Sequence, residues 1–160
     1  MEQAKSVDLK ESFVWGLDLP DEHPSVTMEN PFLGRNQWPV EIPEFKKSVY
    51  PFFEAGLQCG LDMMRAFALG MGLPEDSFLK ATDEPIARSS IIHYPPQSED
   101  LGEEQFGVAP HTDYGCLTLL WQDQVGGLEV QNREGEWVTA HPIDNTLVVN
   151  VGDLLMRWTN

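Results

Sequence analysis

The sequence predicts an α+β, mainly β fold in which a helical N-terminal half packs on a β-rich C-terminal half. Residues 43–71 carry apolar side chains at steps of three and four, which is typical of an amphipathic helix. After Pro85, short apolar segments alternate with turn signals, as in a sandwich, barrel or jelly roll. The chain has 160 residues, of which 41% are hydrophobic, enough for one domain with a core.

The N-terminal half contains one dominant element. We expect residues 1–42 to be irregular, because prolines and Gly34 interrupt any long element, and to be anchored by aromatic side chains. The helix over 43–71 should end near Gly70 and Pro74, and Pro51 is expected to kink it. Residues 75–80 predict one more short helix.

The C-terminal half predicts strands separated by turns. The segment 89–94 is expected to form a strand that Pro95 and Pro96 close, and the acidic stretch 97–109 is expected to form a loop. Gly126-Gly127 and Glu134-Gly135 are turn signals. The remaining strand candidates are 116–122, 127–132, 136–140 and 146–151.

Charge and composition exclude several classes of partner. The 26 acidic and 10 basic residues give a formal net charge of −16, which disfavours nucleic acid and anionic membrane surfaces. No apolar run reaches the length of a membrane span, and the first residues lack the apolar stretch of a signal peptide. Cys59 and Cys116 do not form a disulfide framework. We therefore expect a cytoplasmic protein.

His111 and Asp113 form the most informative motif. In an extended segment, side chains two residues apart point to the same side, so an imidazole and a carboxylate can reach one cation. They would supply two ligands of the 2-His-1-carboxylate triad of non-haem Fe(II) oxygenases. Among the other imidazoles, His93 and His141 are candidates for a third ligand, although each is more typical of a surface or hydrogen-bonded residue.

An ordered series of motifs around this pair resembles one family over nearly the whole chain. The segment that contains the pair is similar to the iron-binding segment of the isopenicillin N synthase-like Fe(II)/2-oxoglutarate-dependent dioxygenases. The motifs that carry the resemblance are Gly107 to Asp123, Gly126 to Val130, Gly135 to Val138, Val149 to Asn160, Lys10-Glu11-Ser12-Phe13, Asn36-Gln37-Trp38-Pro39 and His93-Tyr94-Pro95-Pro96.

The resemblance implies a jelly roll, the double-stranded β-helix, supported by the long helix. It implies that His111 and Asp113 bind Fe(II), with 2-oxoglutarate as cosubstrate. Tyr94 matches a tyrosine that touches the cosubstrate carboxylate, although it reads equally well as a strand aromatic at the pocket rim. A small organic substrate would be oxidised with O₂, giving succinate and CO₂, and the kind of oxidation stays open.

The resemblance also implies an incomplete domain over residues 1–160. Residues 1–85 would form a mostly helical and irregular support region, and residues 86–160 the first part of the jelly roll. In the family, the distal His ligand and the Arg-x-Ser that binds 2-oxoglutarate follow the segment that ends at Asn160. We therefore expect impaired activity for this chain alone, and self-association through unpaired strand edges.

Two other functions fit the same residues. In the first, the chain is a non-catalytic binding or interaction module and the metal motif is vestigial. In the second, it is a jelly-roll hydrolase or isomerase that binds Zn²⁺ or Mn²⁺ through His111 and Asp113, with His93 or His141 as third ligand.

Overall fold

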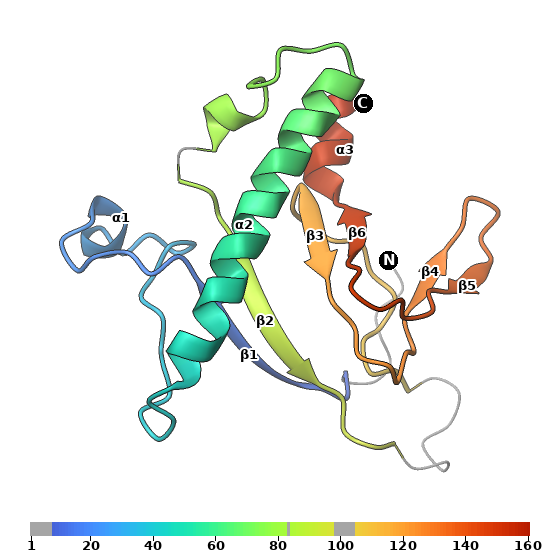
Figure 1. Cartoon of the computed structure of the whole chain (residues 1–160), viewed down its shortest axis with the longest axis horizontal. Coiled ribbons are helices and arrows are strands. Elements are labelled where there is room, and N and C mark those ends of the chain that lie inside the picture. The colour runs from blue at the N-terminus through green and yellow to red at the C-terminus, as the bar shows by residue number, and fades with distance from the viewer. Residues whose placement is uncertain (1–7, 83, 98–104) are drawn as a thin grey trace. The chain divides into compact units, whose positions relative to one another are not determined.

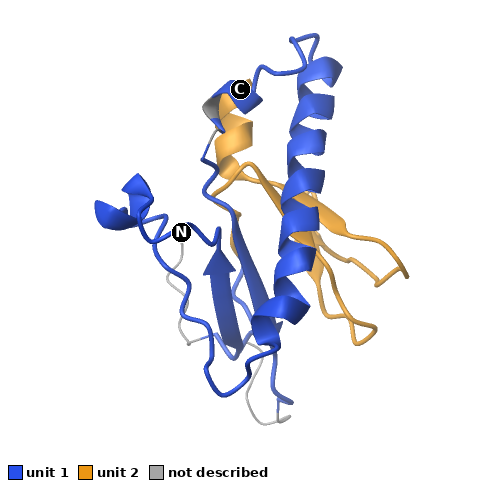
Figure 2. Cartoon of the chain, turned by 60° about the vertical axis from the view of Figure 1, so that its left-hand side comes forward, with its two compact units in different colours: residues 1–110 blue, residues 111–160 orange. Residues whose placement is uncertain are grey.

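The structure is a computed structural model that describes residues 8–82, 84–97 and 105–160. It contains two compact units, residues 1–110 and residues 111–160 (Figure 2). The first seven residues and most of the predicted loop 97–109 lie outside the described residues. The division of the chain at residue 85 stays a prediction.

The predicted long helix is present as α2, which spans Phe45–Gly70 (Figure 1). Pro51 lies inside it, and its inward side chains include the buried Phe53, Met64 and Ala68. After the helix, the N–H groups of Gly72 and Leu73 donate hydrogen bonds to the carbonyl groups of Leu69 and Ala68 in its last turn. The amphipathic pattern therefore identified this element correctly, to within two residues at its start.

Strand β1, Glu11–Gly16, pairs antiparallel with β2, Arg88–His93, which is the predicted strand 89–94 shifted by one residue. The expectation of an irregular segment over 1–42 is wrong for β1, as it is for the short helix α1, Pro24–Thr27. In β1 the more buried side chains alternate, with Phe13 partly exposed and Trp15 only 3% exposed. The prolines that follow β1 led the sequence analysis to miss this strand.

Aromatic side chains fill the core of the first unit. Phe13 on β1 meets Phe45 at the start of α2 edge to face, with ring centroids 5.0 Å apart. Such tilted and edge-to-face arrangements are the favoured ones between aromatic rings. The anchoring role predicted for the N-terminal aromatics is confirmed for Phe13, Trp15 and Trp38, which form a cluster with Phe45, Tyr50 and Phe53 of α2. It is wrong for the predicted anchor Phe32, which is 59% exposed.

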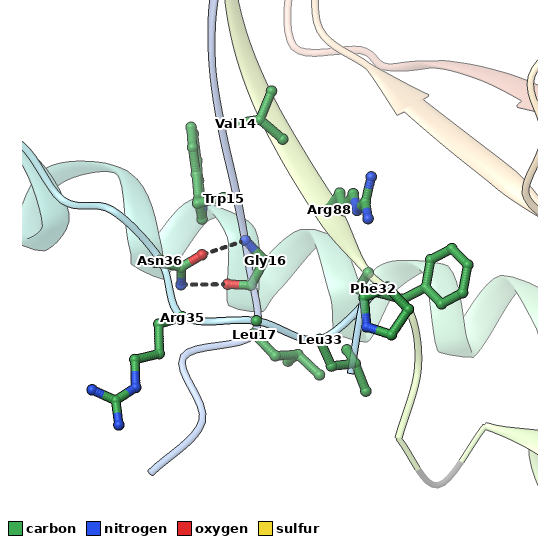
Figure 3. Close-up of a pocket in the computed structure, with 12 residues that line it drawn as sticks. Val14, Trp15, Gly16, Leu17, Phe32, Leu33, Arg35, Asn36 and Arg88 are labelled. Carbon is green, nitrogen blue, oxygen red and sulfur yellow. Dashed lines mark hydrogen bonds between the residues drawn. The ribbon is translucent and has the colours of Figure 1, made fainter. Parts of the chain in front are cut away.

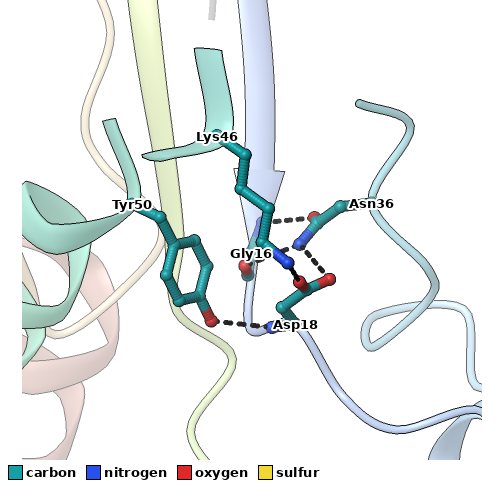
Figure 4. A network of polar contacts seen from close by, with 5 residues as sticks. All are labelled: Gly16, Asp18, Asn36, Lys46 and Tyr50. Carbon is teal, nitrogen blue, oxygen red and sulfur yellow. Dashed lines mark hydrogen bonds and ion pairs between the residues drawn. The ribbon is translucent and has the colours of Figure 1, made fainter. Parts of the chain in front are cut away.

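A polar network joins the end of β1 to the start of α2 (Figure 4). Lys46 forms an ion pair with Asp18, and Tyr50 accepts a hydrogen bond from the Asp18 amide at 2.9 Å. Partial burial is the largest single influence and would raise the pKa of Asp18. The hydrogen bond and charge of Lys46, helped by Asn36 and Trp38, outweigh burial and hold this pKa below its ordinary value of 3.8.

Asp18→Asn should therefore destabilise the protein in a pH-dependent way. A carboxyl whose pKa is lower in the folded state stabilises that state above its unfolded pKa, and this contribution disappears as the pH falls through the folded value. The difference in unfolding free energy between wild type and Asp18→Asn should be largest near neutral pH. It should shrink below pH 3.8 in urea unfolding series. Asp21→Asn, which removes an exposed ion pair with Arg35, is the matched charge change.

A hollow of about 170 Å³ lies beside the end of β1 (Figure 3). The Asn36 amide binds the last residue of β1, accepting a hydrogen bond from Gly16 N–H at 2.8 Å and donating one to Gly16 C=O at 3.0 Å. Among the described residues that line it, Arg35 and Arg88 are the only charged ones, and none carries a carboxylate, imidazole or thiol. This lining therefore offers no metal-binding chemistry.

The second unit consists of antiparallel strand pairs and a short helix. Strand β3, Leu117–Leu120, pairs with β6, Val148–Val151. The two strands that lie between these in the sequence, β4, Glu129–Gln131, and β5, Trp137–Thr139, pair with each other in a separate sheet. All four lie inside the predicted strand segments, and Gly135 forms the predicted turn between β4 and β5. The short apolar segments therefore located these strands.

Two short elements differ from the sequence expectation. The predicted helix over 75–80 is replaced by turns and a single 3₁₀ turn, η1, at Leu79–Ala81. The sequence predicted no helix after the strand candidate 146–151, but Asp153–Thr159 form a helix, α3. Elements this short depend on tertiary contacts more than on local preference. Among the described residues, no helix is both long and apolar enough to cross a bilayer.

Candidate metal centre

The His111–Asp113 segment lies in an irregular stretch, with three residues between it and the start of β3. His111 Nε2 and Asp113 Oδ1 lie 3.7 Å apart, with the imidazole 59% and the carboxylate 24% exposed. Two ligands bound to one transition-metal ion at about 2.1 Å each lie at most about 4.2 Å apart. The pair therefore lies within the reach of one ion, as the spacing of two residues predicts.

The Asp113 carboxylate is also held from β6. Asn150 Nδ2 donates a hydrogen bond to Asp113 Oδ2 at 3.3 Å, so one carboxylate oxygen is engaged while the other faces His111. Asn150 sits at the centre of β6, opposite Thr118 on β3. The register of this strand pair therefore determines which side chain reaches the predicted ligand.

The backbone of the motif is fixed by the start of α3. Asp153 N–H donates to Asp113 C=O at 2.8 Å, and Leu154 N–H donates to Gly115 C=O at 3.2 Å. Thr112, between the two predicted ligands, donates its hydroxyl proton to Asp153 Oδ2 at 3.0 Å. The first turn of α3 thus binds the same loop through main-chain and side-chain groups.

Close packing at Gly152 makes this arrangement possible. Gly152 is buried and donates its N–H to Cys116 C=O at 2.9 Å. A Cβ atom at Gly152 would lie 2.2 Å from Gly115 O and 2.9 Å from Asp113 O. Burial raises the pKa of the neighbouring Cys116 thiol.

The described residues contain no group of three His, Cys, Asp or Glu side chains that would hold one ion. His141 is exposed in the loop before Pro142. His93 Nδ1 lies 3.2 Å from Glu11 Oε2 across the β1–β2 pair, and His23 caps α1 by accepting from Ser25 N–H. Within the second unit, His141 does not complete a set of three with the pair. His93 belongs to the first unit, and its role as third ligand stays a prediction.

Tyr94 directly follows β2 and belongs to the first unit, with 49% of its surface exposed. Its ring lies on Gly107, where an added Cβ would come within 2.8 Å of Tyr94 Cδ1. The Tyr94 ring can therefore pack against Gly107 only because this residue has no side chain.

A comparison with protein-family models matches residues 86–160 to the 2OG-Fe(II) oxygenase superfamily. This part of the chain belongs to that superfamily. The family resemblance found in the sequence is thus confirmed, and the matched residues include His111 and Asp113 together with the Asn150–Asp153 segment that holds them.

Whole-chain comparisons agree with the superfamily. The chain is 34% identical over 165 residues to the 2-oxoglutarate-Fe(II) type oxidoreductase hxnY of Emericella nidulans, covering 100% of this chain and 47% of that protein. It is 38% identical over 162 residues to the 2-oxoglutarate-dependent dioxygenase citB of Monascus ruber, covering 95% and 49%. The chain thus spans about half the length of these curated relatives.

Two solved structures support the coarse fold. A full-length Neurospora crassa protein crystallised with alpha-KG matches with a TM-score of 0.82 and 36% identity, over 97% of this chain and 46% of that one. A putative 2OG-Fe(II) oxygenase family protein from Caulobacter crescentus also has a TM-score of 0.82, with 33% identity over 99% and 50% of the two chains. The predicted class of antiparallel strands with a long helix is therefore confirmed.

The structure shows contacts of the metal motif with residues that the sequence did not single out. The motif scan selected His111 and Asp113, and left Thr112, Asn150 and Asp153 without a role. One signal was available for Asn150, a polar residue in the middle of the apolar run Val148-Val149-Asn150-Val151. A half-buried polar side chain in such a run needs a hydrogen-bond partner, and here the partner is a predicted ligand.

Proposed function

We propose that this protein functions as an Fe(II)/2-oxoglutarate-dependent dioxygenase in which His111 and Asp113 hold the iron. The observation that carries the proposal is the 3.7 Å approach of His111 Nε2 to Asp113 Oδ1, inside the segment that the superfamily model matches. An imidazole nitrogen and a carboxylate oxygen are donors that Fe(II) accepts, so the pair fits part of its site. We place the third protein ligand outside the described residues.

The residues around the pair provide a prepared binding site. Asn150 occupies one oxygen of Asp113 and leaves the other for the ion, while α3 fixes the backbone of the motif. When bound, Fe(II) would supply the coupling of O₂ reduction to the decarboxylation of 2-oxoglutarate and the oxidation of a small organic substrate. The role of the protein residues is to hold and orient these groups.

The finer fold assignment belongs to the same proposal. We propose that β3, β4, β5 and β6 are strands of a double-stranded β-helix, with α2 as its supporting helix. The support comes from the likeness to the Neurospora crassa structure and from the antiparallel pairing of these strands. A location in the cytoplasm and self-association through strand edges stay predictions.

Production of succinate tests the proposed activity. The protein that contains this chain, mixed with Fe(II), 2-oxoglutarate and O₂, should release succinate above the background of its His111→Ala variant. We expect the 160-residue polypeptide by itself to release little, because its described residues offer two ligands and no group of three. Absence of His111-dependent succinate from the containing protein would favour the non-catalytic module.

Tyr94→Phe tests the cosubstrate contact. If the Tyr94 hydroxyl donates to the 2-oxoglutarate carboxylate, its removal should weaken 2-oxoglutarate binding about tenfold, or about 1.4 kcal/mol, as for a hydrogen bond to a charged group. Calorimetric titration of the Mn²⁺-loaded protein measures this change. Tyr114→Phe, at a tyrosine that is 92% exposed, is the matched control. Equal affinity in Tyr94→Phe and wild type would identify Tyr94 as a rim aromatic.

A further inference from the structure

Asn150 is a polar side chain that contacts a predicted ligand, Asp113, from a different element. Its Nδ2 donates to Asp113 Oδ2 at 3.3 Å across 37 positions of sequence. The residue is half-buried and lies on the β6 face opposite that of the exposed Val149 and Val151. This contact is a second, independent restraint on the carboxylate, in addition to the backbone bonds of the loop.

The two restraints act on different degrees of freedom. The hydrogen bond from Asp153 N–H to Asp113 C=O fixes the main chain at 2.8 Å, but a carboxylate on a fixed backbone still rotates about two side-chain bonds. The amide of Asn150 limits that rotation by engaging Oδ2, and Oδ1 is then the oxygen on the side of His111. Groups that hydrogen-bond to metal-binding carboxylates orient them and increase metal affinity.

We infer that Asn150 is a positioning residue for the proposed Fe(II) site: its amide holds Asp113 Oδ2 and thereby presents Oδ1 beside His111 Nε2. The inference rests on the proposed function, since it requires that His111 and Asp113 bind a metal. A purely structural role for Asn150 would affect folding alone. The positioning role also predicts an effect on metal affinity at equal stability.

Mn²⁺ binding by the 160-residue chain distinguishes these roles, because Mn²⁺ accepts nitrogen and oxygen ligands and the free ion has a strong EPR signal. Asn150→Leu keeps the approximate volume and removes the donor, and it should weaken Mn²⁺ binding about tenfold or more. Asn150→Ala removes the amide without adding apolar bulk and should do the same. Asn150→Gln keeps an amide donor and should recover most of the affinity.

Thr146→Val is the matched structural control. It removes the hydrogen bond from Thr146 Oγ1 to Ile143 C=O in the turn before β6, with no bond to Asp113. It should lower stability with Mn²⁺ affinity unchanged. Wild-type affinity in both Asn150→Leu and Asn150→Ala, with His111→Ala still impaired, would overturn the positioning role alone. Equal binding by wild type and His111→Ala would overturn the proposed metal site and this inference with it.

Discussion

His111→Ala should lose at least about 100-fold in Fe(II) affinity, because removing a ligand costs no less than the largest effects of the residues around it. The imidazole is one of the two proposed ligands, and Asp113 Oδ1 is its neighbour at 3.7 Å. Anaerobic Fe(II) titration of the purified chain measures the change. In the protein that contains this chain, succinate release should fall to background.

His141→Ala is the control for this substitution. It removes the same kind of side chain from an exposed loop of the same unit. It should leave iron affinity unchanged, whereas the hydrolase or isomerase reading with His141 as third ligand requires a loss. Asp113→Asn completes the series, since it keeps the shape of the side chain and removes the negative charge that attracts the cation. Iron affinity unaffected by either His111→Ala or Asp113→Asn would contradict the proposed ligand pair.

Elements with a long repeating pattern were predictable from sequence. The helix α2 repeats its apolar steps over 26 residues, a pattern long enough to predict the helix in spite of Pro51 in its interior. The strands of the second unit are short, but glycines and polar residues separate them clearly. β1 was missed because the prolines and Gly34 predicted an irregular segment over 1–42, although none of them lies in β1. α3 was missed because seven residues carry too few helical turns to form a pattern.

In the candidate metal centre, too, the features that depend on nearby residues were predictable and those that depend on distant residues were not. The juxtaposition of His111 and Asp113 follows from a spacing of two residues, which is a local property. The contacts of Asn150 and Asp153 with the motif depend on the register of β3 with β6 and on where α3 begins. A single sequence does not specify that register, because both strands are short and apolar. The metal ligands were therefore predictable as candidates, and the residues that position them were not.

Gly152→Ala should destabilise the protein by about 2–3 kcal/mol, at the upper end of the cost of forcing an added methyl into close packing. The backbone of Gly152, at φ −90° and ψ 171°, is one that alanine adopts freely, so the cost is steric. The new Cβ would lie 2.2 Å from Gly115 O and 2.9 Å from Asp113 O. Both are main-chain atoms, which cannot rotate away as a flexible side chain does.

The substitution should also weaken metal binding, because the backbone that must move carries Asp113. Urea unfolding gives the stability change, and Mn²⁺ titration of the folded fraction gives the affinity. Gly115→Ala is the matched control on the other side of the same contact, since an added Cβ there meets nothing within 4 Å. It should be close to neutral in both measurements. If Gly152→Ala matched Gly115→Ala in stability, the loop and α3 would not be packed as closely as the structure places them. A destabilised Gly152→Ala with unchanged Mn²⁺ affinity would separate the fold of this junction from the position of the ligand.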